Sequence, residues 1–134
     1  MAEDTATVDV QANVVGTCKF MTASAILNFG NLDPAVGTDV TATTTLTFWC
    51  TKNATYTVTD DDGLHETVSN QNRMKHATFL EYIPYSFSYT PTSGTGAGKG
   101  TSITLNISGT VRGSNYINAS AGSYSDTVTM TISP

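Results

Sequence analysis

The chain has 134 residues, which is enough for one domain with a real core and too few for two. Charged residues make up 13% of it, against ~25% in an average globular protein, and Thr, Ser, Asn and Gly take their place. The formal net charge of −5 argues against a nucleic-acid or anionic-membrane partner, because either would require a basic patch. No apolar stretch reaches the ~18 residues of a membrane span.

The first predicted element is a strand at residues 5–14. Its even positions are apolar and its odd positions are polar, and a run of this length with period two is a strong signal for a strand with one buried face. Two interpretations stay open: the run is the first strand of its own sandwich, or it pairs with a neighbouring copy of the same protein. The apolar positions are Ala6, Val8, Val10, Ala12 and Val14.

Cys18 and Cys50 are the two cysteines of the chain. An even count in a small, Thr-rich, lysine-poor chain favours a disulfide and an oxidising compartment, and two free thiols in a reduced protein are the alternative. A bridge would close a loop of about 32 residues, which is worth roughly 3–4 kcal/mol in loop entropy. Met1 is followed by Ala-Glu-Asp and not by the basic and hydrophobic regions of a signal peptide, so if the protein is exported we expect this to be its mature chain.

Five further runs of period two follow. Each places apolar side chains on one face and mostly Thr, Ser or Asn on the other. In the third run, Pro84 lacks an amide donor and so marks a sheet edge or a point where the chain changes sheets. The apolar positions are Val40, Ala42, Leu46, Phe48 and Cys50; Tyr56 and Val58; Ile83, Tyr85, Phe87 and Tyr89; Ile103, Leu105, Ile107 and Val111; and Tyr124, Val128, Met130 and Ile132.

Turn signals separate these runs, and helical periodicity is absent throughout. Short strands with no helix between them predict an antiparallel β-sandwich. The sequence ends within its last predicted strand, so we expect no further strand after it. The turns are expected at Gly30-Asn31, Asp33-Pro34, Asp60 to Gly63, Pro91 to Gly100 and Arg112 to Asn115.

Two segments have the composition of ligand-binding loops without the required spacing. The run from Asp60 to Gly63 is not an EF-hand, because Val58 falls at the first ligand position and Ser69 at the twelfth, so we predict a solvated hairpin turn. The glycine-rich segment from Gly94 to Thr101 is not a phosphate-binding loop, because Gly100 stands where Ser or Thr is required, so we predict a flexible loop.

The sequence contains no recognisable catalytic or metal-binding constellation. His65 and His76 are the two histidines, and with Glu66 and Glu81 they would form a metal or acid–base site only if the fold brought them together. A disulfide would leave no thiol nucleophile, and no Gly-x-Ser-x-Gly elbow is present. We therefore expect no enzymatic activity, no metal and no cofactor.

Five aromatic side chains are candidates for a sugar-binding patch or for a cover over the second sheet of the sandwich. They are Trp49, Tyr82, Tyr85, Tyr89 and Tyr116. The first of these alternates with Phe48 and Cys50, which predicts that it lies on the outer face of its strand.

Four features of the sequence together form a pattern that covers nearly the whole chain. The alternating leader runs into Gly16-Thr17-Cys18, a Leu-Asn-Phe-Gly segment at Leu27 to Gly30 precedes a turn, and Cys50 closes a long strand. The sequence ends on the pattern from Ala121 to Ile132, in which the spacing of Gly122, Tyr124 and Asp126 is the most specific piece. In these features the chain resembles the spore coat protein U domain, the family of archaic chaperone–usher pilus subunits. Residues 60–101 resemble the family only in general character and contain none of these motifs.

The resemblance implies an all-β fold, an incomplete immunoglobulin-like antiparallel β-sandwich that lacks its last strand and is completed by a donor strand. Residues 1–15 would be the N-terminal donor-strand extension, and residues 16–134 would be the incomplete pilin domain. The donor face would consist of Ala6, Val8, Val10, Ala12 and Val14. The acceptor groove would be flanked by the last strand, with Val128, Met130 and Ile132 facing inward.

The expected function is that of a structural subunit of an extracellular bacterial pilus, joined head to tail to other copies of itself by donor-strand complementation. The resemblance also implies a periplasmic chaperone that covers the groove, an outer-membrane usher, and secretion through the periplasm to the cell surface. A surface-binding β-sandwich module, such as a tip adhesin or a sugar-binding domain, is the alternative. Neither nucleic-acid binding nor membrane insertion is expected.

Overall fold

The computed structural model describes all 134 residues and consists of strands and loops, with one short 3-10 turn and no α-helix. No helix has the length and apolar character that crossing a membrane would require. In chain order the elements are β1 (Cys18–Phe20), β2 (Val40–Cys50), β3 (Thr55–Asp60), β4 (Arg73–His76), β5 (Tyr82–Pro84), β6 (Ser86–Thr90), β7 (Ser93–Thr95), β8 (Ile103–Val111), the 3-10 turn η1 (Gly113–Asn115), β9 (Tyr124–Ser125) and β10 (Met130–Ser133).

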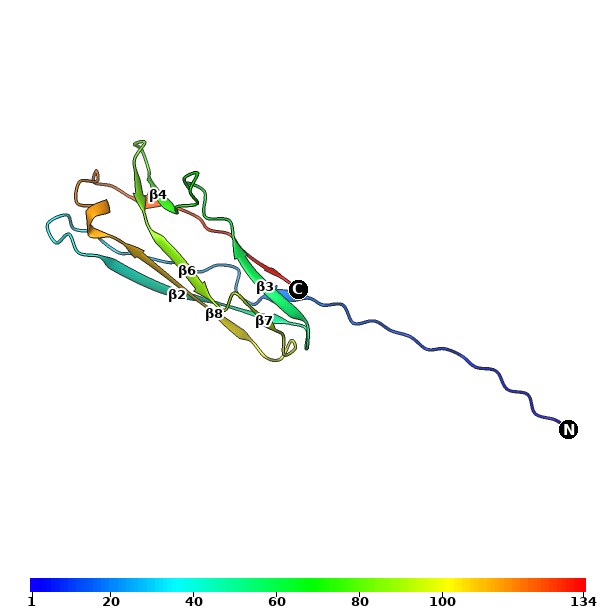
Figure 1. Cartoon of the computed structure of the whole chain (residues 1–134). Helices are drawn as coiled ribbons and strands as arrows, with labels where there is room; N and C mark the ends of the chain where they lie inside the picture. Colours follow the sequence, from blue (N-terminus) through cyan, green and yellow to red (C-terminus); the bar gives the residue numbers. More distant parts are fainter.

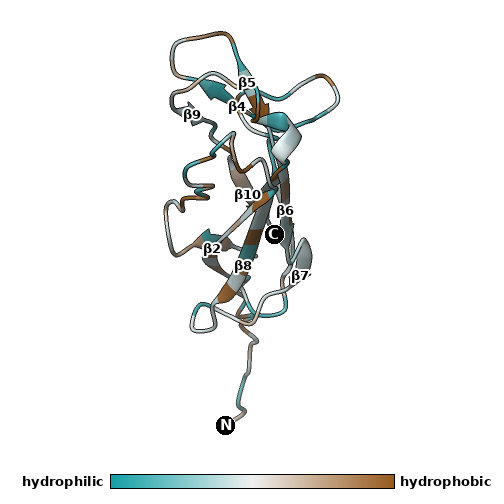
Figure 2. Ribbon diagram, turned by 90° about the vertical axis from the view of Figure 1, so that its left-hand side faces the viewer, coloured by the Kyte–Doolittle hydropathy of each residue, from teal (hydrophilic) through white to brown (hydrophobic).

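The strands form three antiparallel sheets. The largest has the order β1-β2-β8-β6, and the other two have the orders β10-β3-β7 and β5-β4-β9. The molecule is elongated, with β2 and β8 along one side and β3 and β4 along the other (Figure 1). The small sheet of β4, β5 and β9 lies at the end of the molecule that is opposite the N-terminus (Figure 2).

β8 pairs along its whole length with residues 40–48 of β2, from Val40 opposite Val111 to Phe48 opposite Ile103. Their inward side chains alternate with exposed Thr, Ser and Asn, as the period-two pattern predicts. The inward residues pack between the sheets, where the ring of Phe48 meets that of Tyr56 edge to face at 5.1 Å between centroids. The main core cluster is Phe48, Cys50, Tyr56, Val58, Leu105 and Ile107, and a second cluster is Ile83, Tyr85, Val111 and Tyr116.

Pro84 marks a change of sheet, as predicted. β5, which ends at Pro84, pairs with β4, whereas β6, which begins at Ser86, pairs with β8. Tyr85 lies between the two strands and is 5% exposed. The chain therefore crosses from one layer to the other at a residue whose ring fills the core.

Three turn and strand predictions need correction. The last predicted strand is not continuous, because residues 126–129 separate β9 from β10. The glycine-rich segment is not simply a flexible loop: it contains β7, which pairs with β3, and Gly94 lets the backbone pass close over the Tyr56 ring. The run from Asp60 to Gly63 is not a hairpin turn but opens the long connection between β3 and β4.

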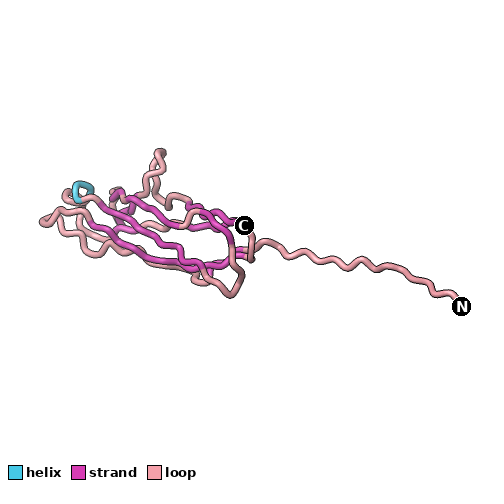
Figure 3. Tube along the Cα trace, turned by 60° about the horizontal axis from the view of Figure 1, so that its bottom comes forward, coloured by secondary structure: helices cyan, strands magenta, loops and turns pink.

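The first sixteen residues form an extended tail that pairs with none of the strands of the domain. It projects straight away from the body of the molecule (Figures 1 and 3). Val8, Val10 and Val14 are 84%, 90% and 82% exposed. The tail is therefore not the first strand of its own sandwich in this structure.

Candidate strand-accepting groove

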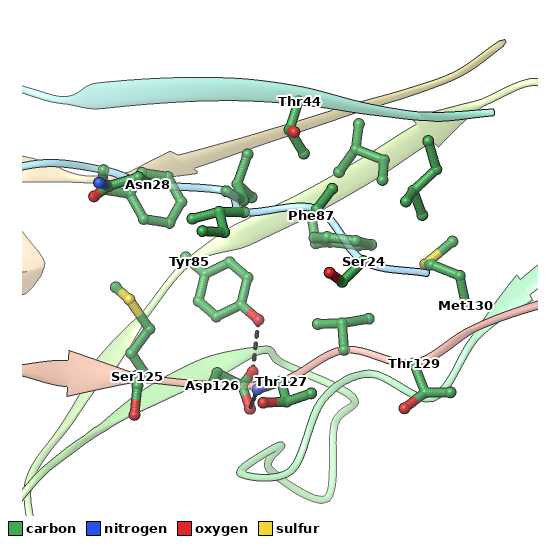
Figure 4. Close-up of a pocket in the computed structure, with 18 of the residues that line it drawn as sticks. Ser24, Asn28, Thr44, Tyr85, Phe87, Ser125, Asp126, Thr127, Thr129 and Met130 are labelled. Carbon is green, nitrogen blue, oxygen red and sulfur yellow. Dashed lines mark hydrogen bonds between the residues drawn. The ribbon is translucent and has the colours of Figure 1, made fainter. Parts of the chain in front are cut away.

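An open groove with a volume of about 630 Å³ runs between residues 20–29 and residues 124–130 (Figure 4). These two segments are its walls, and we call them the first wall and the second wall. The floor is apolar and comes from β2, β6, β8 and the residue between β5 and β6. Its side chains include Leu46, Tyr85, Phe87 and Ile107.

The first wall has no ladder partner along most of its length. It follows β2 as far as Met21, whose N–H donates to the carbonyl of Thr47 at 2.8 Å. Beyond that point residues 22–29 make no backbone–backbone hydrogen bond. Leu27 and Phe29 turn their side chains toward the core clusters. The backbone groups of this wall are thus available to another strand.

The second wall is paired on one side only. β10 pairs with β3, and the N–H of Asp61 donates to the carbonyl of Thr129 at 3.2 Å, which extends the same register. In an antiparallel ladder, alternate residues direct their backbone groups to opposite sides. The backbone N–H and C=O groups of the odd-numbered residues in the second wall therefore point toward β3. The backbone groups of Val128 and Met130 point toward the groove.

The structure places two of the three predicted groove residues in the lining. Val128 and Met130 line the groove, whereas Ile132 lies beyond it and packs against the main core cluster. Sequence reasoning missed the first wall and its inward side chains Leu27 and Phe29. Their alternation around Asn28 was the available signal, but it is too short to predict an open strand edge.

The proposed donor residues all lie on the exposed tail, outside the groove of their own molecule. Thr51 holds the base of the tail, because its backbone N–H donates to the carbonyl of Thr17 at 2.9 Å and its hydroxyl accepts the N–H of Thr17 at 2.9 Å. The same hydroxyl donates to the carbonyl of Val15 at 3.2 Å. The next residue, Gly16, lies beside Pro134, so the tail leaves the domain at the end where β10 finishes.

Cys18 and Cys50 form a disulfide, and the chain has no free cysteine. The two residues are directly opposite each other where β1 pairs with β2. The bridge therefore fixes the strand that follows the tail to the central strand of the largest sheet, and the alternative of two free thiols does not apply to this structure.

The motif residues Gly122, Tyr124 and Asp126 lie at the start of the second wall. Gly122 has a φ of +138°, and a Cβ there would meet the imidazole of His76. The Tyr124 ring packs edge-on against the same imidazole at 5.0 Å between centroids, and its hydroxyl donates to the carbonyl of Ser120 at 2.8 Å. Burial raises the pKa of the Tyr124 hydroxyl, which keeps it protonated as a donor.

Asp126 connects the second wall to the floor. Its carboxylate accepts the hydroxyl of Tyr85 at 2.5 Å and the N–H of Leu64 at 2.8 Å. Burial, followed by the neighbouring Asp126 carboxylate, raises the pKa of Tyr85 above the usual range for tyrosine. The Tyr85 hydroxyl is therefore a fixed hydrogen-bond donor at any physiological pH.

His76 is a structural residue with both ring nitrogens engaged. It is 5% exposed, its Nδ1 accepts the N–H groups of Thr78 and Phe79 at 3.0 Å each, and its Nε2 lies 2.8 Å from the carbonyl of Ala121. Acceptance at Nδ1 assigns the proton to Nε2, which then donates to Ala121. No ring nitrogen is left to bind a metal.

The other candidate sites do not assemble. No group of three or more His, Cys, Asp or Glu side chains is placed to hold a metal ion. The side chain of Asp60 accepts the N–H of Asp62 at 2.7 Å, and that of Asp61 accepts backbone N–H groups, so the run from Asp60 to Gly63 is organised by its own chain. His65 lies against the ring of Tyr82.

The five candidate aromatic residues do not share one surface. Tyr85 and Tyr116 belong to the second core cluster, with exposures of 5% and 2%. Arg73 covers the ring of Tyr82 at 3.9 Å from its centroid. A sugar-binding platform made of all five is therefore excluded by their placement.

Both the sequence and the fold of this chain match known proteins. The family model described as the spore coat protein U domain matches residues 4–131. Protein U of Myxococcus xanthus is 33% identical over an alignment of 156 positions, which spans 98% of this chain and 85% of that protein.

Two solved structures share the fold. A chain of the chaperone–tip adhesion subunit pre-assembly complex from the archaic chaperone–usher Csu pili of Acinetobacter baumannii matches with a TM-score of 0.58 and 20% identity, over 89% of this chain and 40% of that one. A chain of the chaperone–tip adhesin complex of CFA/I fimbriae matches with a TM-score of 0.51 and 13% identity, over 89% of this chain and 41% of that one. The fold is an incomplete immunoglobulin-like antiparallel β-sandwich, and the chain spans about 40% of the length of these solved chains.

Proposed function

Since the chain belongs to the spore coat protein U domain family, we propose that it is a structural subunit of an extracellular bacterial pilus, joined to its neighbours by donor-strand complementation. The observation that carries this proposal is the coexistence, in one molecule, of an unfilled groove and an unpaired tail with one apolar face. The tail of one copy fills the groove of the next.

The tail is long enough to span the groove, and its alternation suits it. The donor face from Ala6 to Val14 has nine residues and spans roughly 26 Å at ~3.3 Å per residue, against seven residues in the second wall at residues 124–130. A strand laid between the two walls hydrogen-bonds to both of them and turns its apolar side chains onto the floor. The polar positions of the tail, such as Gln11, then face solvent.

The energy of this contact is large enough to hold a fibre together. Burying a Val side chain contributes ~1.5–3 kcal/mol, so Val8, Val10 and Val14 together contribute roughly 5–9 kcal/mol before the cost of association. Each ladder hydrogen bond adds about 1 kcal/mol net. The contact is head to tail and therefore propagates as an open fibre.

The groove is filled by a second copy because the tail is held away from its own groove. Thr51 and the Cys18–Cys50 disulfide fix the base of the tail at the end of the molecule where β10 finishes. From there the tail points outward (Figure 3). It is thereby presented to a neighbouring molecule.

A chaperone, an usher and export complete the proposal. The two solved structures that share the fold are chaperone–subunit complexes by their descriptions. A chaperone strand would cover the apolar groove until a neighbour's tail replaces it, and the oxidised Cys18–Cys50 pair suits the periplasm and the cell surface. No step in this function requires a catalytic residue.

The alternative of a surface-binding module has weaker support from the site. The matched complexes contain tip adhesion subunits, but two of the five candidate sugar-stacking rings are in the core. Specific binding in a glycan-array screen would favour this alternative.

The experiment that tests the proposed function compares two charge substitutions on opposite faces of the tail. Purified full chain is expected to form concentration-dependent multimers that resist SDS. Val10→Asp should abolish them, because it would place a charge in the apolar groove, whereas Gln11→Asp adds the same charge to the solvent face and should leave them. SDS gels and negative-stain microscopy measure the result. Normal fibres from Val10→Asp would contradict the proposal.

A further inference from the structure

Residues 126–129 of the second wall are held in place without a neighbouring strand. β9 ends at Ser125 and β10 begins at Met130, so the stretch between them lies outside the paired strands, and its one backbone–backbone hydrogen bond is that from the N–H of Asp61 to the carbonyl of Thr129. Two of its backbone N–H groups are nevertheless bonded, and in both cases the acceptor is a carboxylate side chain.

Asp126 is the acceptor at one end of this stretch. Its Oδ1 accepts the N–H groups of Leu64 at 2.8 Å and of Thr127 at 2.9 Å. Its Oδ2 accepts the hydroxyl of Tyr85, a buried residue of the groove floor (Figure 4). One carboxylate thus ties the wall to the floor and to the loop behind it.

Asp61 is the acceptor at the other end. Its Oδ1 accepts the N–H groups of Thr129 at 2.9 Å and of Gly63 at 3.0 Å, and its own N–H donates to the carbonyl of Thr129. These bonds lie on the side of the wall where β3 pairs with β10. The backbone groups of Val128 and Met130 consequently face the groove.

We propose that Asp61 and Asp126 are positioning residues of the strand-accepting groove. Their carboxylates accept backbone N–H groups of residues 126–129, as a neighbouring strand would. They thereby keep this wall extended and in register before the incoming strand binds. The inference rests on the proposed donor-strand function and assigns these two carboxylates, with Tyr85, a part in it. A wall that is ordered in advance lowers the ordering cost of association, so its loss weakens capture of the donor.

The test uses the full chain carrying Val10→Asp as an acceptor that does not donate its own tail. The probe is a fluorescent peptide with the sequence of residues 4–15, and its capture and release are followed by anisotropy. The variants are Asp126→Ala, Asp126→Asn and Tyr85→Phe. Tyr116→Phe is the matched control, because it removes a buried tyrosine hydroxyl that donates to the carbonyl of Thr38 at 2.7 Å, outside the groove.

The peptide should be released about tenfold faster from Tyr85→Phe, which loses the hydrogen bond between the Tyr85 hydroxyl and the charged Asp126 carboxylate. Release from Asp126→Ala should be at least as fast, because that variant also loses the bonds from the N–H groups of Leu64 and Thr127. Asp126→Asn should be intermediate, because it keeps an oxygen for the two N–H groups. Tyr116→Phe should leave the release rate unchanged. If Asp126→Ala does not fold, Tyr85→Phe decides the question, because it removes a single oxygen atom.

Two outcomes would overturn the positioning role while leaving the donor-strand function in place. One is equal release from all variants, and the other is equal acceleration in Tyr116→Phe, which would show a general loss of stability. If the peptide does not bind even the Val10→Asp acceptor that carries no further substitution, that result would contradict the proposed function and also the positioning role.

Discussion

At the scale of single residues, Gly122 sets the path by which the chain enters the second wall. Its φ of +138° lies in a region that favours glycine, and the position of its Cα leaves no room for a side chain next to His76. His76 in turn is fixed by bonds on both ring nitrogens. The spacing of Gly122, Tyr124 and Asp126 thus reflects packing and hydrogen bonding at one end of the groove.

Gly122→Ala should lower the free energy of unfolding by about 2 kcal/mol or more, because both backbone strain and a clash with the His76 ring result. Gly100→Ala is the matched control, since a Cβ there meets nothing within 4 Å, and it should stay within about 0.5 kcal/mol of the parent. Urea unfolding of both variants, in the Val10→Asp background that prevents assembly, measures the difference. Equal midpoints would show that the glycine is not required by the fold.

At the scale of elements, the alternation of apolar and polar residues predicted those strands that pair along their whole length. β2 and β8 are the clearest cases, because each is buried on one face and hydrogen-bonded throughout. The same alternation predicted one continuous last strand, yet residues 126–129 separate β9 from β10 and make a single backbone–backbone hydrogen bond, from the N–H of Asp61 to the carbonyl of Thr129. The alternation indicates which side chains face the core. It does not indicate whether a neighbouring strand is hydrogen-bonded to the backbone of that segment.

The groove could be predicted only in part, for a related reason. The period-two pattern predicted that Val128 and Met130 share an apolar face, and the family resemblance assigned them to a groove and included Asp126 in its motif. The partners of Asp126, Tyr85 and Leu64, are far from it in sequence and are brought to it only by the change of sheet at Pro84 and the loop after β3. No pattern within the final segment contains that information.

The wall formed by the last strand should weaken in acid. Hydrogen bonding from the Thr129 N–H lowers the pKa of Asp61 below its ordinary value. A carboxyl whose pKa is lower in the folded state stabilises that state above its unfolded pKa, and this contribution is lost as the pH falls through the folded pKa. The stability of the Val10→Asp chain should therefore decline below about pH 4.

Urea midpoints measured across this range test the assignment to Asp61. Asp61→Asn keeps an oxygen acceptor but does not titrate, so its acid decline should be shallower than that of the parent. An equally steep decline in Asp61→Asn would show that the acid sensitivity of this wall has another source.

At the scale of the whole molecule, the chain exposes more surface than a completed domain of its mass. A folded monomer of this size is expected to expose about 6,700 Å², whereas this chain exposes 9028 Å², and only 15 of its 134 residues are buried. The extended tail, in which Val8, Val10 and Val14 are all more than 80% exposed, and the open groove both contribute to this surface. Inserting one into the other between copies would remove both from water, which is the driving force of the proposed assembly.

The most direct test of donor-strand complementation is a cryo-electron microscopy structure of fibres assembled from the purified full chain. Donor-strand complementation predicts continuous density for residues 5–14 of one copy between residues 20–29 and 124–130 of the next, with Val8, Val10 and Val14 directed at the floor. A fibre in which the grooves are empty, or in which each tail lies within its own molecule, would contradict it.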